Sequence, residues 1–162
     1  MLRRHFLAGS LAAAAPFTKP LGLSLYTIRG PLASRPAETC KAVASLGITL
    51  LEVRADNLNN HGAMIRDAGL KPVHMFIDSA VITGAWDEWA KLMARMKAAP
   101  PAVKPTIEDV IATATKHGLK RIGISMLLQG EREGAIDKIN KAAETCAKAK
   151  VELYYHNHAW EF

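Results

Sequence analysis

Residues 151–162 read Val-Glu-Leu-Tyr-Tyr-His-Asn-His-Ala-Trp-Glu-Phe and are the strongest indication of the fold. The first five residues of this stretch form an apolar, strand-like run, and a group of polar side chains follows at once. Polar residues at the carboxyl end of a strand are typical of α/β proteins, which keep their reactive groups there. We therefore interpret this stretch as the fifth strand of a parallel α/β structure.

The residues upstream alternate between strand-like and helical patterns. We expect strands at 21–27, 48–53, 70–77, 121–126 and 151–155, and helices at 38–46, 60–68, 86–98, 106–118 and 133–150. Strand–helix repeats of this kind form parallel sheets with right-handed crossovers. The predicted class is α/β, and two architectures fit it. One is an open doubly wound sheet; the other is a partial (β/α) TIM-type barrel of about five parallel strands with alternating helices. No glycine-rich phosphate loop follows the first strand, which lowers the expectation of a nucleotide site.

Within the predicted strands, alternate residues separate into two faces. In a barrel the outer face packs on helices and is apolar, whereas the inner face lies toward the barrel axis. The residues expected on the inner face are Tyr26, Glu52, His74, Ser125, Glu152, Tyr154, His156 and, if the extended run continues, His158. We expect Tyr26, Glu52, His74, Ser125 and His156 to line a polar mouth at the carboxyl ends of the strands.

Composition indicates one globular domain. The chain has 162 residues, of which 49% are hydrophobic, and a formal net charge of +6. Its basic residues are spread out without interleaved aromatic residues, which favours solvated helix faces over a nucleic-acid partner. Cys40 and Cys146 fall in predicted amphipathic helices and are interpreted as buried free thiols. A disulfide in an oxidising compartment is the alternative.

Residues 1–20 are interpreted as an export signal peptide. Arg3 and Arg4 precede an apolar stretch from Phe6 to Ala15, which ends in the small residues that a signal peptidase needs. The arginine pair followed by x-Phe-Leu resembles a twin-arginine signal, with an ordinary secretory signal as the alternative. The stretch is too short to be a stable membrane anchor. We expect a periplasmic or secreted protein whose folded domain is residues 21–162.

Two segments resemble the sugar phosphate isomerase/epimerase family, which shares the xylose isomerase-like TIM barrel. Residues 21–29, LGLSLYTIR, are similar to that family's first strand, LGxQLYTxR, and residues 155–162, YHNHAWEF, are similar to its YHNHxxEF motif. The resemblance covers residues 21–162. It implies the N-terminal part of a barrel, apparently truncated after strand five, because a complete barrel needs roughly 250 residues.

The resemblance also implies a chemistry. Members of the family bind one divalent metal (Mn, Mg, Co or Zn) and isomerise or epimerise sugars or keto-sugars by metal-assisted proton transfer. It places a metal ligand at His156, while the other ligands would come from strands six to eight, so the expected metal site is incomplete in this chain. The candidate catalytic residues are Glu161, His74 and Glu52, and the candidate substrate-binding residues are Tyr26, His158 and Asn157.

Structural interpretations of these residues remain open. One alternative is that His156 and His158 form a hydrogen-bonded pair that orders the strand end. For Glu161 the alternative is an exposed terminal carboxylate. His74 and Glu52 are alternatively polar residues satisfied within the core. Trp86, Trp89 and Met93 at helical spacing indicate core or lid packing.

The function predicted from the sequence is a sugar (phosphate) isomerase/epimerase with a small-molecule sugar as its partner. The first alternative is an inactive truncated barrel that serves as a sugar-binding or structural module, whose exposed sheet edges would favour a homo-oligomer. The second alternative is an endonuclease IV-like enzyme on the same barrel, which the export signal and the absence of a zinc-binding set of histidines and carboxylates disfavour. The contiguous His156-Asn157-His158 is not an HNH nuclease motif, because that motif is spread over a ββα unit.

Overall fold

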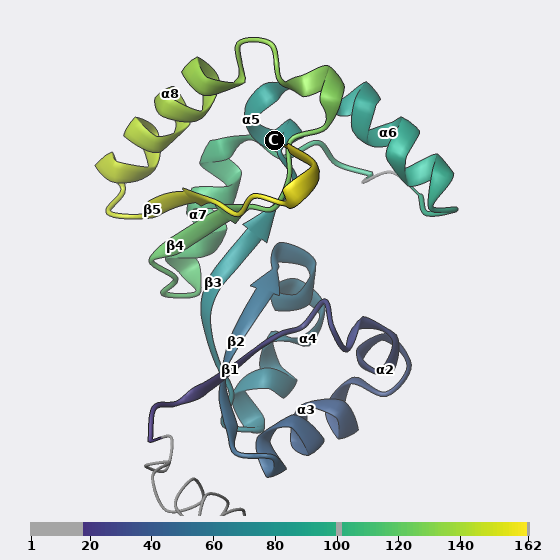
Figure 1. Cartoon of the computed structure of the whole chain (residues 1–162). Helices are drawn as coiled ribbons and strands as arrows, with labels where there is room; N and C mark the ends of the chain where they lie inside the picture. Colours follow the sequence, from purple (N-terminus) through teal and green to yellow (C-terminus); the bar gives the residue numbers. More distant parts are fainter. Residues whose placement is uncertain (1–17, 100–101, 162) are drawn as a thin grey trace, which may run out of the picture.

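Five parallel strands form a single sheet in the order β1-β2-β3-β4-β5 (Figure 1). The computed structural model describes residues 18–99 and 102–161. The strands are β1 (Leu21–Ser24), β2 (Ile48–Arg54), β3 (Lys71–Ile77), β4 (Arg121–Ile124) and β5 (Glu152–Tyr155). Each strand pairs with the next one along the chain. A doubly wound sheet reverses its strand order at a switch point, whereas a barrel does not. The prediction of a partial barrel is therefore confirmed and the doubly wound alternative is excluded.

The helices fill the connections between the strands. They are α2 (Arg29–Ser34), α3 (Pro36–Ser45), α4 (Ala55–Asp67), α5 (Ala80–Thr83), α6 (Trp86–Arg95), α7 (Ile107–Lys116) and α8 (Ala135–Lys148), with the short 3₁₀ turns η1 (Gln129–Glu131) and η2 (Ala159–Glu161). No helix among residues 18–99 and 102–161 is long and apolar enough to cross a membrane. Apart from residues 18–20, the predicted signal peptide lies outside the described residues.

The bounds of strand β1 and of helix α4 differ from the sequence prediction for local reasons. Strand β1 ends at Ser24 rather than at residue 27, because the Thr27 N–H turns back to the Ser24 carbonyl at 3.0 Å. Helix α4 begins at Ala55, five residues before the predicted start. The Asn57 side chain accepts the Arg54 N–H at 2.9 Å, a capping contact that starts the helix directly after β2.

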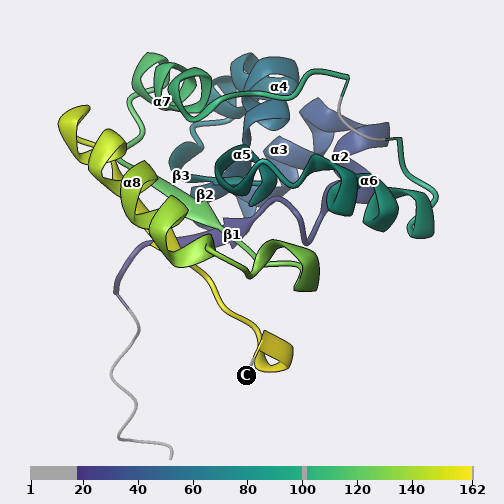
Figure 2. The same ribbon diagram turned by 90° about the horizontal axis from the view of Figure 1, so that it is seen from above.

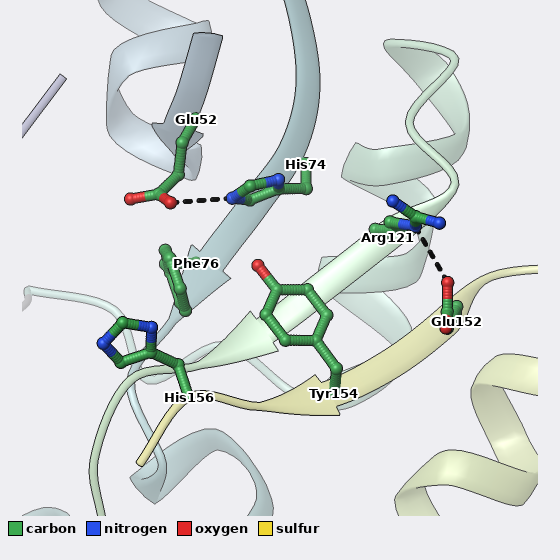
Figure 3. A pocket seen from close by; sticks show the side chains of 7 residues that line it. All are labelled: Glu52, His74, Phe76, Arg121, Glu152, Tyr154 and His156. Atoms are coloured by element: carbon green, nitrogen blue, oxygen red, sulfur yellow. Dashed lines mark hydrogen bonds and ion pairs between the residues drawn. The ribbon is translucent and has the colours of Figure 1, made fainter. Parts of the chain in front are cut away.

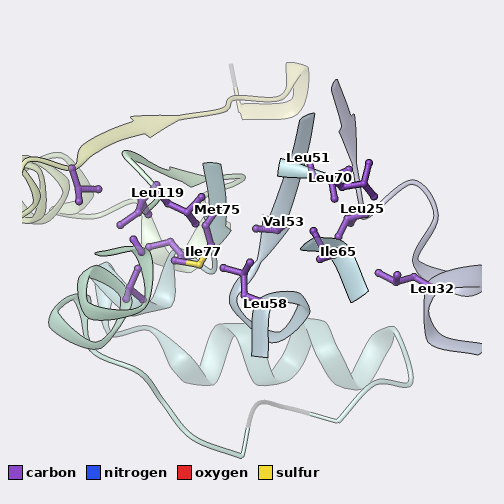
Figure 4. Close-up of a cluster of buried hydrophobic side chains, with 14 of the residues drawn as sticks. Leu25, Leu32, Leu51, Val53, Leu58, Ile65, Leu70, Met75, Ile77 and Leu119 are labelled. Carbon is purple, nitrogen blue, oxygen red and sulfur yellow. The ribbon is translucent and has the colours of Figure 1, made fainter. Parts of the chain in front are cut away.

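The core lies between the sheet and the helices on its outer face. Figure 2 shows α3, α4 and α7 on one side of the sheet. Leu51 of β2, Met75 of β3 and Ile65 of α4 are fully buried in this core (Figure 4). Ile122 and Ile124 of β4 are fully buried in the same core. Burial of each such side chain stabilises the fold by about 1.5–3 kcal/mol. These buried residues occupy alternate positions of their strands, which leaves the other residues of each strand on the opposite face, called here the inner face.

Cys40 and Cys146 are buried free thiols, as predicted. Cys40 lies in α3 and Cys146 in α8, both facing the core. Burial raises the pKa of both thiols above the ordinary value, which keeps them protonated. Neither thiol is therefore a candidate nucleophile.

Candidate functional site

A pocket of about 400 Å³ lies on the inner face of the sheet (Figure 3). Its lining residues come from four adjacent strands: Glu52, His74, Phe76, Arg121, Glu152, Tyr154 and His156. The strand register explains the grouping. Glu52 of β2 is aligned with His74 of β3, and Gly123 of β4 is aligned with both Phe76 and Tyr154. Alternation along each strand and alignment between strands thus bring these side chains together on one face.

Glu52 and His74 form a direct polar pair in this pocket. The His74 Nε2 lies 2.8 Å from the Glu52 Oε2, and the Ser24 hydroxyl donates to the Glu52 Oε1 at 2.5 Å. About a quarter of each side chain of the pair is exposed. A carboxylate that orients a partly exposed imidazole is an arrangement suited to general acid–base chemistry.

Aromatic rings form the wall next to this pair. The rings of His74, Phe76, Tyr154 and His156 meet edge to face at centroid distances of 5.6–5.7 Å. Their close packing depends on Gly123. A Cβ at that position would lie 2.5 Å from the Tyr154 Cζ and 2.7 Å from the Phe76 Cε1. Apolar walls with a few convergent polar groups are typical of small-molecule sites.

At the N-terminal ends of β4 and β5 the pocket is bordered by an ion pair. The Arg121 Nε lies 2.9 Å from the Glu152 Oε2, and both side chains are more than half exposed. Exposed pairs of this kind contribute about 0–1 kcal/mol to stability. The pair therefore marks the rim of the pocket and contributes little to the fold.

The predicted site residues fall into two groups. Glu52, His74 and His156 line the pocket together, and His158 lies next to it with its ring 5.0 Å from that of His156. Tyr26 lies outside the lining, 58% exposed, with the Arg29 guanidinium 4.3 Å above its ring. Asn157 is also exposed and outside the lining.

Glu161 is tied into the backbone instead of facing the pocket. Its carboxylate accepts the Leu127 N–H at 3.1 Å and the His158 N–H at 2.7 Å, and it also bonds the Tyr155 hydroxyl. Burial alone would raise the pKa of Glu161, but these hydrogen bonds outweigh it and lower the pKa below its ordinary value. With its side chain only 6% exposed, Glu161 holds the turn after β5 against the loop after β4.

A second carboxylate, Glu131, was not singled out from the sequence. It is 2% exposed and accepts four hydrogen bonds. The donors are the hydroxyls of Ser79 and Thr83, both at 2.7 Å, the Leu128 N–H at 2.8 Å and the Trp89 Nε1–H at 3.2 Å. Glu131 thereby joins the loop after β4 to the segment after β3. Trp89 is buried, in agreement with the predicted core or lid packing.

Phe76 was also not singled out from the sequence. It lines the pocket from β3. Its position two residues after His74 is a usable signal, because alternate residues of a strand share a face. Tyr154 and Glu152 were placed on the inner face by the same alternation, and both line the pocket.

The described residues do not make a complete metal centre. Residues 18–99 and 102–161 contain no group of three or more His, Cys, Asp or Glu side chains placed to hold a metal ion. His156 lines the pocket beside Phe76, with ring centroids 5.6 Å apart. A histidine supplies a single ligand, so a metal ion at His156 would need further donors.

Comparison with known proteins supports the fold. No family model and no curated protein matches the sequence. Two solved structures described as sugar phosphate isomerase/epimerases, both from Parabacteroides distasonis, do match. One has a TM-score of 0.64 at 18% identity, over 93% of this chain and 55% of that chain. The other has a TM-score of 0.65 at 20% identity, over 90% of this chain and 57% of that chain.

A third match has a different described activity. The probable 3-DHS dehydratase AsbF from Bacillus anthracis matches with a TM-score of 0.54 at 14% identity, over 83% of this chain and 51% of that chain. At identities this low, the three structural matches show a common fold and nothing more. The chain spans about half the length of the structures that it matches, and its five strands correspond to part of their barrels.

Proposed function

We propose that the pocket on the inner face is part of a sugar isomerase/epimerase site, in which Glu52 and His74 move a proton on a sugar or keto-sugar. The observation that carries the proposal is the 2.8 Å contact between His74 and Glu52 in a pocket lined by aromatic rings. The likeness in fold to two proteins described as sugar phosphate isomerase/epimerases adds support.

The proposed reaction needs one group that removes a proton from the sugar and one that returns a proton. Interconversion of sugar isomers removes a proton from the carbon next to a carbonyl and returns one to another position, without net change in composition. A histidine and a carboxylate within hydrogen-bond distance can share these two roles. If the Nε2–H of a neutral His74 is donated to Glu52, the Nδ1 is the acceptor that takes the proton.

The metal predicted from the family resemblance stays a proposal. A divalent ion would polarise the carbonyl of the sugar when bound. The described residues offer no group of three ligands for such an ion. His156 is the ligand that we propose, and metal analysis of the purified protein tests it. His156→Ala should lower the bound Mn, Mg, Co or Zn, and unchanged metal content would contradict the assignment.

Exchange of carbon-bound protons tests the proposed activity. The protein is incubated in D₂O with aldoses, ketoses and their phosphates, and deuterium incorporation next to the carbonyl is followed by NMR. We expect incorporation with the wild type and none with Glu52→Gln. Glu38→Gln is the matched control, because Glu38 is an exposed residue of α3 outside the pocket. Absence of exchange in the wild type with every sugar would contradict an enzymatic role.

A sugar-binding or structural module is the second candidate function. It is favoured by the lack of a group of three metal ligands among the described residues. Binding of sugar without proton exchange would support it. In the described residues β1 and β5 are the edges of the sheet, and exposed edges pair readily with other chains. We therefore propose a homo-oligomer for this module, and its mass in solution by light scattering tests it.

The location and the remaining partners are proposals from the sequence. The paired Arg3-Arg4 and the apolar stretch after them support export to the periplasm or beyond by a twin-arginine-like signal. Fusion of residues 1–20 to a reporter that works only after export tests this, with Arg3→Lys and Arg4→Lys together as the variant expected to stop it. The scattered basic residues support the absence of a nucleic-acid partner, which a DNA-binding assay over a range of salt concentrations checks.

A further inference from the structure

Tyr154 carries a buried hydroxyl that the proposed proton transfer does not use. The side chain belongs to β5 and lines the pocket. Its ring lies 5.6 Å from the His74 ring and 5.7 Å from the Phe76 ring, centroid to centroid. The hydroxyl has almost no exposed surface and no hydrogen-bond partner among the residues that the structure describes. Figure 3 shows it pointing toward the Glu52–His74 pair.

The lack of a side chain at Gly123 leaves room for this hydroxyl. Gly123 lies beneath the ring, and a Cβ there would be 2.5 Å from the Tyr154 Cζ and 2.6 Å from its hydroxyl oxygen. Any residue other than glycine would therefore push the ring away from the sheet. The glycine in β4 therefore leaves the space that the Tyr154 ring occupies.

An unpaired buried hydroxyl is costly. Leaving such a group without a partner costs about 1–3 kcal/mol, and most buried polar groups in native proteins are paired. The two Glu52 oxygens are already engaged, one by Ser24 and the other by His74. A tyrosine hydroxyl is protonated near neutral pH, so the group can donate a hydrogen bond.

We propose that Tyr154 is a substrate-binding residue, whose hydroxyl donates a hydrogen bond to a carbonyl or hydroxyl oxygen of a bound sugar. This assignment rests on the proposed function, because it takes the ligand to be a sugar. Because the hydroxyl has almost no exposed surface, the proposal requires a neighbouring pocket side chain to move when the ligand binds. The cost of the unpaired hydroxyl is then removed by the ligand.

The test uses Tyr154→Phe, which keeps the ring and removes only the hydroxyl. Two opposite effects are expected. Without ligand, the melting temperature should rise, because an unpaired buried group is gone. With ligand, affinity for the sugars that bind the wild type should fall about tenfold, since one hydrogen bond is lost. Affinity is measured by calorimetry with D-glucose, D-xylose, D-fructose and their phosphates.

Tyr155→Phe is the matched contrast, from the next residue on the opposite face. Its hydroxyl is bonded to Glu161, so its removal should lower the melting temperature. Gly123→Ala should weaken sugar binding as Tyr154→Phe does, by displacing the ring. A purely structural role for Tyr154 predicts a lower melting temperature and unchanged affinity, and that result would overturn the assignment.

Failure of this inference and failure of the proposed function give different results. If the wild type binds a sugar and Tyr154→Phe binds it equally well, only the assignment of Tyr154 is wrong. If the wild type binds none of the sugars, the proposed function is wrong, and with it the sugar ligand of Tyr154. If sugar binds and the two opposite effects appear together, both are supported.

Discussion

Two carboxylates in different parts of the molecule, Glu131 and Glu52, have opposite surroundings. Glu131 is 2% exposed and accepts four hydrogen bonds. Glu52 is about a quarter exposed, lines a pocket and has two partners, Ser24 and His74. A carboxylate saturated with donors can only hold structure together. A carboxylate that faces a cavity and touches a histidine keeps part of its capacity for a ligand.

The two sites also depend on different parts of the chain. Glu131 joins segments that follow β3 and β4, and so orders loops at the carboxyl ends of these strands. Glu52 lies within β2, and strand pairing positions it. Loss of Glu131 should therefore disturb the fold, whereas loss of Glu52 should disturb the chemistry.

The largest expected effect is that of Glu131→Ala. It leaves the donors of Ser79, Thr83, Trp89 and Leu128 without their acceptor in a buried place, and should cost about 3–4 kcal/mol of unfolding free energy. Urea unfolding followed by circular dichroism measures it. Glu131→Gln keeps the shape and one acceptor oxygen, although its NH₂ group faces donors. The loss of unfolding free energy should therefore be smaller than in the alanine variant. A loss below about 1 kcal/mol for the alanine variant would contradict the structural role.

Glu161→Ala should have an intermediate effect. It removes the acceptor of two backbone N–H groups and of the Tyr155 hydroxyl, and we expect a loss of about 1–3 kcal/mol. Amide hydrogen exchange should show faster exchange at Leu127 and His158, with the core strands unchanged. Equal protection of these two amides in variant and wild type would show that Glu161 does not hold the turn.

A smaller effect is expected from acid. The pKa of Glu161 is lower in the folded protein than its ordinary value. Its carboxylate therefore contributes stability above the ordinary carboxyl pKa, and this contribution is lost as pH falls through the lowered value. Melting temperatures between about pH 7 and about pH 3 should fall less steeply in Glu161→Gln than in the wild type. Parallel curves for the two proteins would contradict this.

The smallest effect on stability is expected for Glu52→Gln. The side chain is partly exposed, and glutamine retains an oxygen that can accept the Ser24 hydroxyl, so the change should be within about 1 kcal/mol. Urea unfolding under the conditions used for Glu131→Ala gives the comparison. A loss as large as that of the Glu131 variant would mean that the two carboxylates do not differ in role.

Period-two alternation predicted most of the pocket. It placed Glu52, His74, Tyr154 and His156 on one face, and parallel pairing then brought them together. Alternation failed for Tyr26, because β1 ends at Ser24 and the chain turns before residue 26. The family motifs at residues 21–29 and 155–162 pointed to the same fold that the structural matches show.

The Glu131 cluster could not be predicted in the same way. Its side-chain donors lie 42 to 52 residues away along the chain, and they come from loop and helix positions without a regular period. The contacts of Glu161 could not be predicted from the sequence for a different reason. Its place in a family motif suggested a catalytic role, whereas its bonds to two backbone amides appear only once the turn after β5 is formed.

Measuring stability and deuterium incorporation together in Glu52→Gln and Glu131→Gln tests the central claim most directly. We expect Glu52→Gln to unfold within about 1 kcal/mol of the wild type and no longer to exchange carbon-bound protons of the sugar. We expect Glu131→Gln to be clearly less stable than the wild type, yet to exchange protons where it is folded. Retained exchange in Glu52→Gln, with exchange in the wild type, would contradict the claim that the pocket on the inner face is the reactive site.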